Sequence, residues 1–145
     1  MNILLVGLGG MGVCHYMNYQ QIEGAQVVAC VGKAQSDHER AGQWGVPIYE
    51  SIAGACEAHD VDVIDVCTPT HLHKPLVLEA AACKKHVICE KPCTTTEAQT
   101  RELYALAREK GLFFMEAQKM LFLPAVLAAK QAIDQGRLGK IHMAE

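Results

Sequence analysis

Short apolar runs alternate with longer segments of helical character along the whole chain. The runs are rich in Val, Ile, Leu and Cys, and the first four end at a glycine or just before a proline-containing loop, as strands buried on both faces of a sheet do. The expected strands cover residues 2–6, 26–31, 61–67, 86–89, 112–115 and 140–144. This βαβ spacing predicts an α/β fold with a doubly wound, mostly parallel sheet, helices on both faces and right-handed crossovers.

Local sequence signals indicate where the helices between these strands begin and end. Asp37 and Ser51 are expected to be N-caps, because their side chains can accept hydrogen bonds from free N–H groups of a first turn. Thr94 with Glu97 has the spacing of a capping box, and Pro124 suits a first helical position. The expected helices cover residues 10–20, 37–44, 51–60, 75–84, 94–111 and 124–136.

Composition and charge exclude several classes of protein. The 145 residues are 50% hydrophobic, which is enough for a sizeable core. Thirteen basic and sixteen acidic residues give a net charge of −3, whereas a general nucleic-acid binder needs a basic surface. No apolar run reaches the ~18–20 residues of a membrane span, and the N-terminus lacks the basic start of a signal peptide. We therefore expect neither nucleic-acid nor membrane partners.

The seven cysteines are interpreted as reduced structural thiols. Their number is odd, no Cys-x-x-Cys occurs, and most lie in apolar surroundings. Only Cys89 and Cys93 approach the spacing of zinc ligands, and no second pair follows them. We expect no metal site, and reduced thiols favour a cytoplasmic location.

A glycine-rich loop follows the first strand. Gly7, Gly9 and Gly12, with Gly10 and Met11 between the last two, match Gly-x-Gly-x-x-Gly at a strand-to-helix turn. Gly7 would allow the tight turn, Gly9 would let a pyrophosphate approach, and Gly12 would let the helix pack on the strand. The helix N-terminus would supply free N–H groups and a positive dipole to the phosphates. The motif predicts a dinucleotide site; the alternative is a glycine-rich turn without a ligand.

The second expected strand ends without the acidic residue that bonds the adenosine ribose in NAD sites. About 20 residues after the loop stand Gly32 and Lys33, with Ser36 close behind. A lysine and a serine could instead bind a 2′-phosphate, so NADP(H) is slightly favoured over NAD(H). The alternative for Lys33 is a solvated loop lysine, and Asp37 comes too late unless the loop folds back.

Polar residues follow the third and fourth strands, at the edge of the sheet where ligands of open α/β folds bind. Thr68, Pro69 and Thr70 end one strand, and Glu90 and Lys91 end the next. Lys91 is the sharpest candidate for catalysis, because a lysine beside a cofactor can exchange a proton with a substrate hydroxyl. Its alternative is an ion pair with Glu90 or another acid.

His73 follows the first of these two loops. Its imidazole could contact a ribose or a substrate. The alternative is a histidine at a helix entry that faces water.

Three motifs together resemble the N-terminal half of the Gfo/Idh/MocA oxidoreductases. They lie at residues 7–12, 67–73 and 86–92, and the likeness continues through residues 114–119, 122–124 and 136–141. The resemblance implies a Rossmann domain that binds NAD(P), and hydride transfer between nicotinamide C4 and a carbinol carbon of a sugar, cyclitol or related polyol. It implies a pyrophosphate site at Gly7, Gly9 and Gly12.

The resemblance also assigns roles to later residues. Thr68, Pro69 and His73 would line the path from the adenosine ribose to the nicotinamide. Glu90 would seat the cofactor, and Lys91 would touch the reactive oxygen of the substrate. Gln118 and Lys119 would belong to the substrate pocket.

The chain departs from the family pattern in several places. The acid after the second strand is missing, Lys84 stands for a frequent glycine, and Leu121 stands for a frequent arginine. The resemblance implies a second domain after this one, and we expect that domain to be largely absent from this chain. We expect a Rossmann domain over residues 1–120, and a crossing helix with the first strand of a C-terminal domain over 121–145.

Two expectations follow from that domain organisation. The chain alone should have low activity, and the full-length enzyme should be a homo-oligomer. The alternative function is a non-catalytic NAD(P)-sensing protein or regulator, which the presence of Lys91 disfavours.

Overall fold

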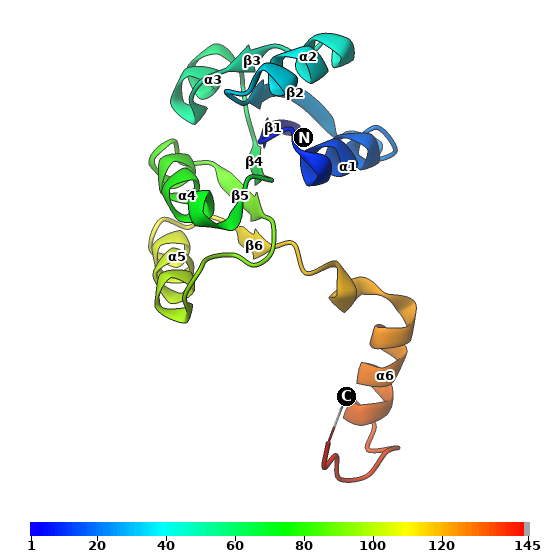
Figure 1. The fold of residues 1–145 in the computed structure, drawn as a ribbon. Coiled ribbons are helices and arrows are strands. Elements are labelled where there is room, and N and C mark those ends of the chain that lie inside the picture. Colours follow the sequence, from blue (N-terminus) through cyan, green and yellow to red (C-terminus); the bar gives the residue numbers. More distant parts are fainter. Residues whose placement is uncertain (144–145) are drawn as a thin grey trace.

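Six parallel strands form one sheet in the computed structural model, which describes residues 1–143 (Figure 1). The strands are β1 (Asn2–Val6), β2 (Gln26–Val31), β3 (Ile48–Tyr49), β4 (Val63–Val66), β5 (His86–Cys89) and β6 (Phe114–Glu116). Their order is β3-β2-β1-β4-β5-β6, and all five neighbouring pairs are parallel. From β1 the chain adds β2 and β3 toward one edge of the sheet, and then β4, β5 and β6 toward the other edge. The strand order therefore reverses between β1 and β4. Ligands of such folds bind at this point.

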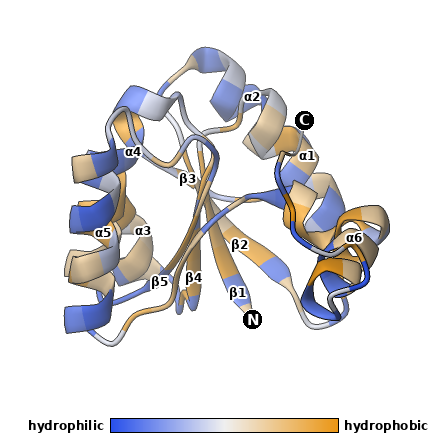
Figure 2. Cartoon of the chain, turned by 90° about the horizontal axis from the view of Figure 1, so that it is seen from below, coloured by the Kyte–Doolittle hydropathy of each residue, from blue (hydrophilic) through white to orange (hydrophobic). Residues whose placement is uncertain are grey.

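Helices cover both faces of the sheet, which confirms the doubly wound prediction (Figure 2). Helices α1 (Gly10–Tyr19) and α2 (Gln35–Trp44) lie on one face, and α3 (Ile52–Ala58), α4 (His73–Ala82) and α5 (Glu97–Glu109) lie on the other. Two 3-10 turns, η1 (Thr70–Leu72) and η2 (Lys119–Phe122), precede α4 and α6 (Pro124–Asp134). Helix α6 stands away from the sheet (Figure 1).

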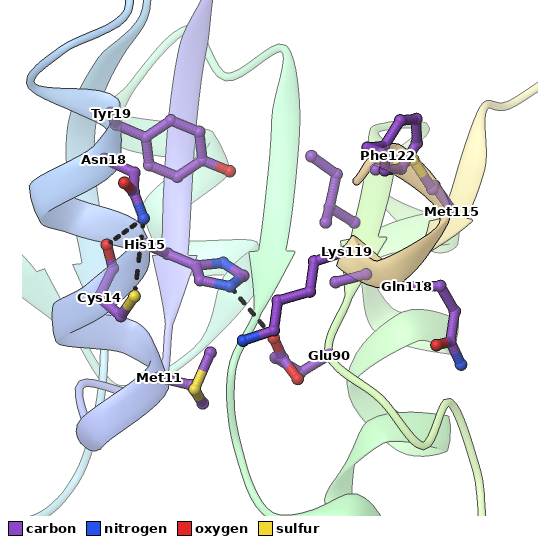
Figure 3. Close-up of a pocket in the computed structure, with 12 residues that line it drawn as sticks. Met11, Cys14, His15, Asn18, Tyr19, Glu90, Met115, Gln118, Lys119 and Phe122 are labelled. Atoms are coloured by element: carbon purple, nitrogen blue, oxygen red, sulfur yellow. Dashed lines mark hydrogen bonds and ion pairs between the residues drawn. The ribbon is translucent and has the colours of Figure 1, made fainter. Parts of the chain in front are cut away.

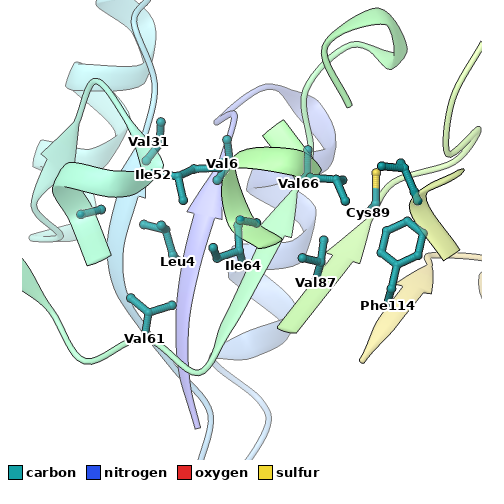
Figure 4. Packing of buried hydrophobic residues seen from close by; sticks show 14 of the residues in the cluster. Leu4, Val6, Val31, Ile52, Val61, Ile64, Val66, Val87, Cys89 and Phe114 are labelled. Atoms are coloured by element: carbon teal, nitrogen blue, oxygen red, sulfur yellow. The ribbon is translucent and has the colours of Figure 1, made fainter. Parts of the chain in front are cut away.

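The hydrophobic core follows the alternation of side chains along the strands. Leu4 and Val6 of β1 and Ile64 and Val66 of β4 pack toward α3, α4 and α5 (Figure 4). Alternate residues such as Ile3 and Leu5 face α1 and α2 instead. The same alternation turns Asp65, which lies between Ile64 and Val66, toward the α1 face. The alternation along β4 therefore buries the Asp65 carboxylate between the sheet and α1.

Two of the expected helix caps are wrong, and one is confirmed. Asp37 is not the N-cap of α2: Ala34 holds that position, and Asp37 Oδ2 accepts a hydrogen bond from the Ala34 N–H at 3.2 Å. Thr96 caps α5 instead of Thr94, whose buried hydroxyl donates to the Thr96 carbonyl at 2.7 Å. Asp37 is therefore the third residue of α2 and reaches back to the N-cap, and the hydroxyl of Thr94 is engaged by the Thr96 carbonyl and not by a free N–H of the first turn. Ser51 caps α3 as expected, accepting from Gly54 N at 3.1 Å.

The expected last strand is absent over residues 140–143, and the end of that prediction lies outside the described residues. A strand there would have no neighbour to pair with, and its N–H and C=O groups would face water. Strand β3 was missed because two residues show no alternation; it exists through pairing of Ile48 and Tyr49 with Cys30 and Val31. Among the described residues, every helix is too short or too polar to cross a bilayer.

Candidate functional site

The glycine loop packs α1 directly onto the end of β1. Gly7 adopts a positive φ of 86°, which turns the chain out of the strand. A Cβ atom on Gly12 would lie 2.0 Å from the Gly7 carbonyl oxygen, so no other residue fits there. A Cβ on Gly9 or Gly10 would meet no atom within 4 Å. The backbone of Gly7 and the close approach at Gly12 form the turn. The open space at Gly9 and Gly10 leaves the helix N-terminus accessible.

A cavity of about 710 Å³ lies at the carboxyl ends of β1, β2 and β4. This volume is within the range of small-molecule and cofactor sites. Its wall includes the glycine loop (7–9), the end of β2 (32–34), the loop after β4 (67–69) and apolar residues of the α4 entry such as Leu72 and Leu76. The cavity therefore occupies the place where the strand order reverses.

Two groups at the wall of this cavity lack a hydrogen-bond partner within residues 1–143. The buried Thr68 Oγ1 has no hydrogen-bond partner within residues 1–143, and an unpaired buried hydroxyl costs about 1–3 kcal/mol. No side chain caps the N-terminus of α1, so its first N–H groups are free to bind an anion. The residues present fit a nicotinamide dinucleotide.

The loop after β2 folds back and brings an acid to the strand end. The condition under which Asp37 could take this place is met: a Cβ on Gly32 would lie 2.7 Å from Asp37 Oδ2. Asp37 and Lys33 both line the cavity, whereas the exposed Ser36 does not. Arg40, which the sequence analysis missed, donates from Nη1 to the Leu8 carbonyl at 2.7 Å and ties α2 to the glycine loop.

The expectation that His73 faces water is wrong. Its side chain is 1% exposed, so it does not face water, and it lines neither of the two cavities. Its Nε2 lies 2.7 Å from the Thr68 carbonyl, and its Nδ1 lies 3.0 Å from the Pro92 carbonyl. His73 thus connects the loop after β4 with the loop after β5.

Glu90 and Lys91 leave β5 next to each other but differ in exposure. Glu90 is 6% exposed, and its Oε2 accepts a hydrogen bond from the Lys91 N–H at 2.9 Å. The Lys91 side chain is exposed and forms no ion pair within residues 1–143, so the expected alternative of a pair with Glu90 is not realised. Its ammonium group is free to meet a ligand.

A second cavity, of about 320 Å³, lies between α1, β5, β6 and η2 (Figure 3). Gln118 and Lys119 line it, as do Met11 at the start of α1 and the buried Glu90. The Lys119 side chain points across the cavity toward His15 and Glu90 (Figure 3). The structure therefore brings the two expected pocket residues to the same cavity as Met11 and Glu90. Lys91 and Thr70 line neither cavity.

His15 joins two carboxylates beside this cavity. Its Nδ1 lies 2.7 Å from Asp65 Oδ2, and its Nε2 lies 3.2 Å from Glu90 Oε1. The hydrogen bond to Asp65, together with the charges of Asp65 and Glu90, raises the pKa of His15 above 6.5 despite its burial. Burial and the Asp65 charge also raise the pKa of the Tyr19 hydroxyl and of the Cys67 thiol. The imidazole is thus favoured in its charged form.

Local sequence patterns do not predict this cluster of His15, Asp65 and Glu90. The only signals were an acid, Asp65, inside an apolar strand and a histidine one turn into the helix after the glycine loop. Asp65 is fully buried and also accepts a hydrogen bond from the Tyr19 hydroxyl at 2.8 Å. Neither signal indicates that the two groups meet.

The cluster of His15, Asp65 and Cys67 also offers atoms that a metal ion could use. The Nδ1–Oδ2 distance of 2.7 Å is that of a charge-assisted hydrogen bond. Two ligands of one zinc ion lie farther apart, because each bond to the metal is about 2.0–2.3 Å. The geometry favours an ionic hydrogen-bond network over a metal centre.

Comparison with known proteins gives the family to which the chain belongs. The sequence profile described as "Oxidoreductase family, NAD-binding Rossmann fold" matches residues 1–118. The chain belongs to the Gfo/Idh/MocA family. The chain is therefore a nicotinamide-dinucleotide-binding Rossmann domain of an oxidoreductase family. The match confirms the resemblance seen in the sequence motifs.

Curated members of the Gfo/Idh/MocA family and solved structures give the extent of the likeness. Levoglucosan dehydrogenase of Pseudarthrobacter phenanthrenivorans is 38% identical over 82 residues, 57% of this chain and 21% of that protein. Mouse trans-1,2-dihydrobenzene-1,2-diol dehydrogenase is 36% identical over 121 residues, 82% of this chain and 36% of that protein. Apo scyllo-inositol dehydrogenase of Lactobacillus casei has a TM-score of 0.88 at 26% identity, with 97% of this chain and 43% of that one covered. The chain thus spans well under half the length of these relatives.

Proposed function

We propose that this chain is the cofactor-binding part of an NAD(P)-dependent dehydrogenase that acts on a carbinol carbon of a sugar, cyclitol or related polyol. The observation that carries the proposal is the cavity at the strand-order reversal, bounded by the glycine loop and by Thr68, next to the uncapped N-terminus of α1. Relatives named for levoglucosan, a dihydrodiol and an inositol support a substrate with hydroxyl-bearing carbons. A second domain and a homo-oligomer of the whole enzyme belong to the same proposal.

The residues that line the two cavities, and Lys91, which lines neither, take separate roles in this reaction. The glycine loop and the free N–H groups of α1 hold the pyrophosphate, and Thr68 donates to or accepts from the cofactor. A bound nicotinamide supplies the hydride chemistry. Lys91 exchanges a proton with the substrate hydroxyl, and Gln118 and Lys119 bind other substrate hydroxyl groups from the second cavity.

Titration of the chain with NADPH and NADH tests the binding part of the proposal. We expect saturable binding of at least one of them, followed through nucleotide fluorescence, because the cavity and the helix N-terminus are already formed. The absence of saturable binding of both nucleotides would refute it.

The choice between the two cofactors depends on groups of opposite charge at the end of β2. Lys33 favours a 2′-phosphate, whereas the Asp37 carboxylate favours a free 2′-hydroxyl. One oxygen of Asp37 already accepts the Ala34 N–H, while the exposed ammonium of Lys33 has no ion-pair partner within residues 1–143. We therefore propose NADP(H), with Lys33 as the residue that binds its 2′-phosphate.

Lys33→Ala should weaken NADPH binding about tenfold and leave NADH binding unchanged, since one charge-assisted hydrogen bond is lost. Dissociation constants of both nucleotides measure this, with the exposed Lys140→Ala as the matched control. Asp37→Asn keeps an acceptor for the Ala34 N–H but removes the charge, and should strengthen NADPH binding. A selective loss of NADH binding in Asp37→Asn would instead assign the ribose contact to Asp37 and the site to NAD(H).

A further inference from the structure

The Glu90 carboxylate is held from two sides. Its Oε1 lies 3.2 Å from His15 Nε2, and its Oε2 accepts the backbone N–H of Lys91 at 2.9 Å. One oxygen is therefore engaged by helix α1 and the other by the backbone of the proposed catalytic residue. Any movement of Glu90 would be transmitted directly to Lys91.

The imidazole of His15 is fixed in turn by Asp65. The Nδ1–Oδ2 distance of 2.7 Å lies in the range of charge-assisted hydrogen bonds, and Asp65 belongs to β4 at the centre of the sheet. Carboxylates only accept hydrogen bonds, so an imidazole that binds one carboxylate through each nitrogen has to donate from both. Only the imidazolium does so.

Burial makes this bridge necessary. Asp65 is fully buried and Glu90 is 6% exposed, and buried carboxylates are costly without a partner of opposite charge. A neutral His15 can donate to only one of the two. Glu90 would then lack its charged partner on α1, and the acceptor of the Lys91 N–H would no longer be fixed from that side.

We propose that His15 is a positioning residue of the reaction: its imidazolium, anchored on Asp65, fixes Glu90 and through Glu90 the backbone of Lys91. This inference rests on the proposed function. It adds a residue that lines the second cavity but not the cavity at the glycine loop, and that acts on the reaction through Glu90 and the backbone of Lys91. The charged or titratable groups that face His15 are Asp65 and Cys67 from β4 and its end, Glu90 after β5, Tyr19 on α1 and Lys119 on η2.

The position of the His15 bridge between Asp65 and Glu90 predicts that it affects binding of the nicotinamide half of the cofactor and not of the adenosine half. His15, Asp65 and Glu90 do not line the cavity that would hold the adenosine half. The matched test ligands are therefore NADPH with 2′-phospho-ADP-ribose, and NADH with ADP-ribose, because each pair differs by the nicotinamide alone. The ratio of the two dissociation constants in a pair reports on the nicotinamide half.

Deprotonation should weaken the bridge as the pH rises. We expect the affinity of the dinucleotide relative to its fragment to fall about tenfold between about pH 6 and about pH 9, with a midpoint equal to that of the His15 ring measured by NMR. His15→Gln should show the weakened ratio at every pH, since an amide does not titrate in this range. The exposed His38→Gln on α2 serves as the matched control and should behave as the unchanged chain.

The outcomes separate the two proposals. Equal weakening of dinucleotide and fragment in His15→Gln would make His15 merely structural and overturn this inference alone. A ratio in the unchanged chain that stays constant while His15 titrates would overturn it as well, and this measurement needs no variant. Failure of the unchanged chain to bind either ligand would overturn the proposed function and this inference with it.

Discussion

Gly12→Ala is expected to abolish dinucleotide binding. The added methyl group would lie 2.0 Å from the Gly7 carbonyl oxygen and 3.0 Å from its carbonyl carbon, and both are backbone atoms that cannot turn aside. Helix α1 would have to move away from β1, which displaces the free N–H groups that hold the phosphates. We expect affinity for NADPH to fall at least about a hundredfold and stability to fall by about 1–3 kcal/mol, as overpacking does.

The matched control is the same substitution at another helical glycine. Gly42 lies within α2, and a Cβ there would meet no atom within 4 Å. Gly42→Ala should leave nucleotide binding unchanged and raise stability by up to about 1 kcal/mol, because alanine is the better helix former. Nucleotide titrations and thermal unfolding of both variants measure the difference. If Gly12→Ala bound NADPH like the unchanged chain, the close packing of loop and strand would not be what forms the site.

Lys91→Ala should remove catalysis and retain cofactor binding. The Lys91 side chain is exposed and lines neither cavity, so its loss disturbs no packing. Loss of a group that exchanges a proton with the substrate lowers rates about 10²–10⁴-fold. We therefore expect kcat of the full-length enzyme on a polyol to fall by that factor, while the dissociation constant for NADPH changes less than about threefold.

Two further variants define the role of Lys91. Lys91→Arg keeps the positive charge but cannot give up a proton near neutral pH, so it should remain almost as slow as Lys91→Ala. Lys110→Ala removes an exposed lysine at the end of α5 and should leave kcat unchanged. Full activity of Lys91→Ala would remove the proton-exchange role. An unchanged protein that binds NADPH but oxidises no polyol would favour the alternative of a sensing protein.

The charge of His15 is also expected to make the stability of the folded chain depend on pH. Its pKa is raised in the folded state by the hydrogen bond to Asp65 and by the charges of Asp65 and Glu90. The contribution of its charged form is therefore fully present below the unfolded value near 6.5 and is lost as the pH rises through the higher folded value. Thermal unfolding of the chain and of His15→Gln across this range is expected to converge at high pH.

Local patterns in the sequence were enough for the sheet, the helices and the dinucleotide loop. Alternation and apolar runs predict strands such as β1 and β4, because these patterns reflect burial on the two faces of a sheet. The glycine spacing at 7, 9 and 12 predicts a phosphate site, since backbone clearance depends on residues close together in the chain. The N-caps of α2 and α5 were wrongly predicted, because more than one polar side chain near each helix start can make the first hydrogen bond.

Local patterns along the chain predict an α/β domain with a dinucleotide loop, and the motifs around Thr68 and Lys91 indicate its family. Two contacts exist only in the folded chain: Asp37 lies against Gly32, and His15 bridges Asp65 and Glu90. These partners are 50 and 75 residues from His15 in the chain. Contacts between such distant residues arise from the strand order and from which face each side chain takes, and no local pattern encodes either.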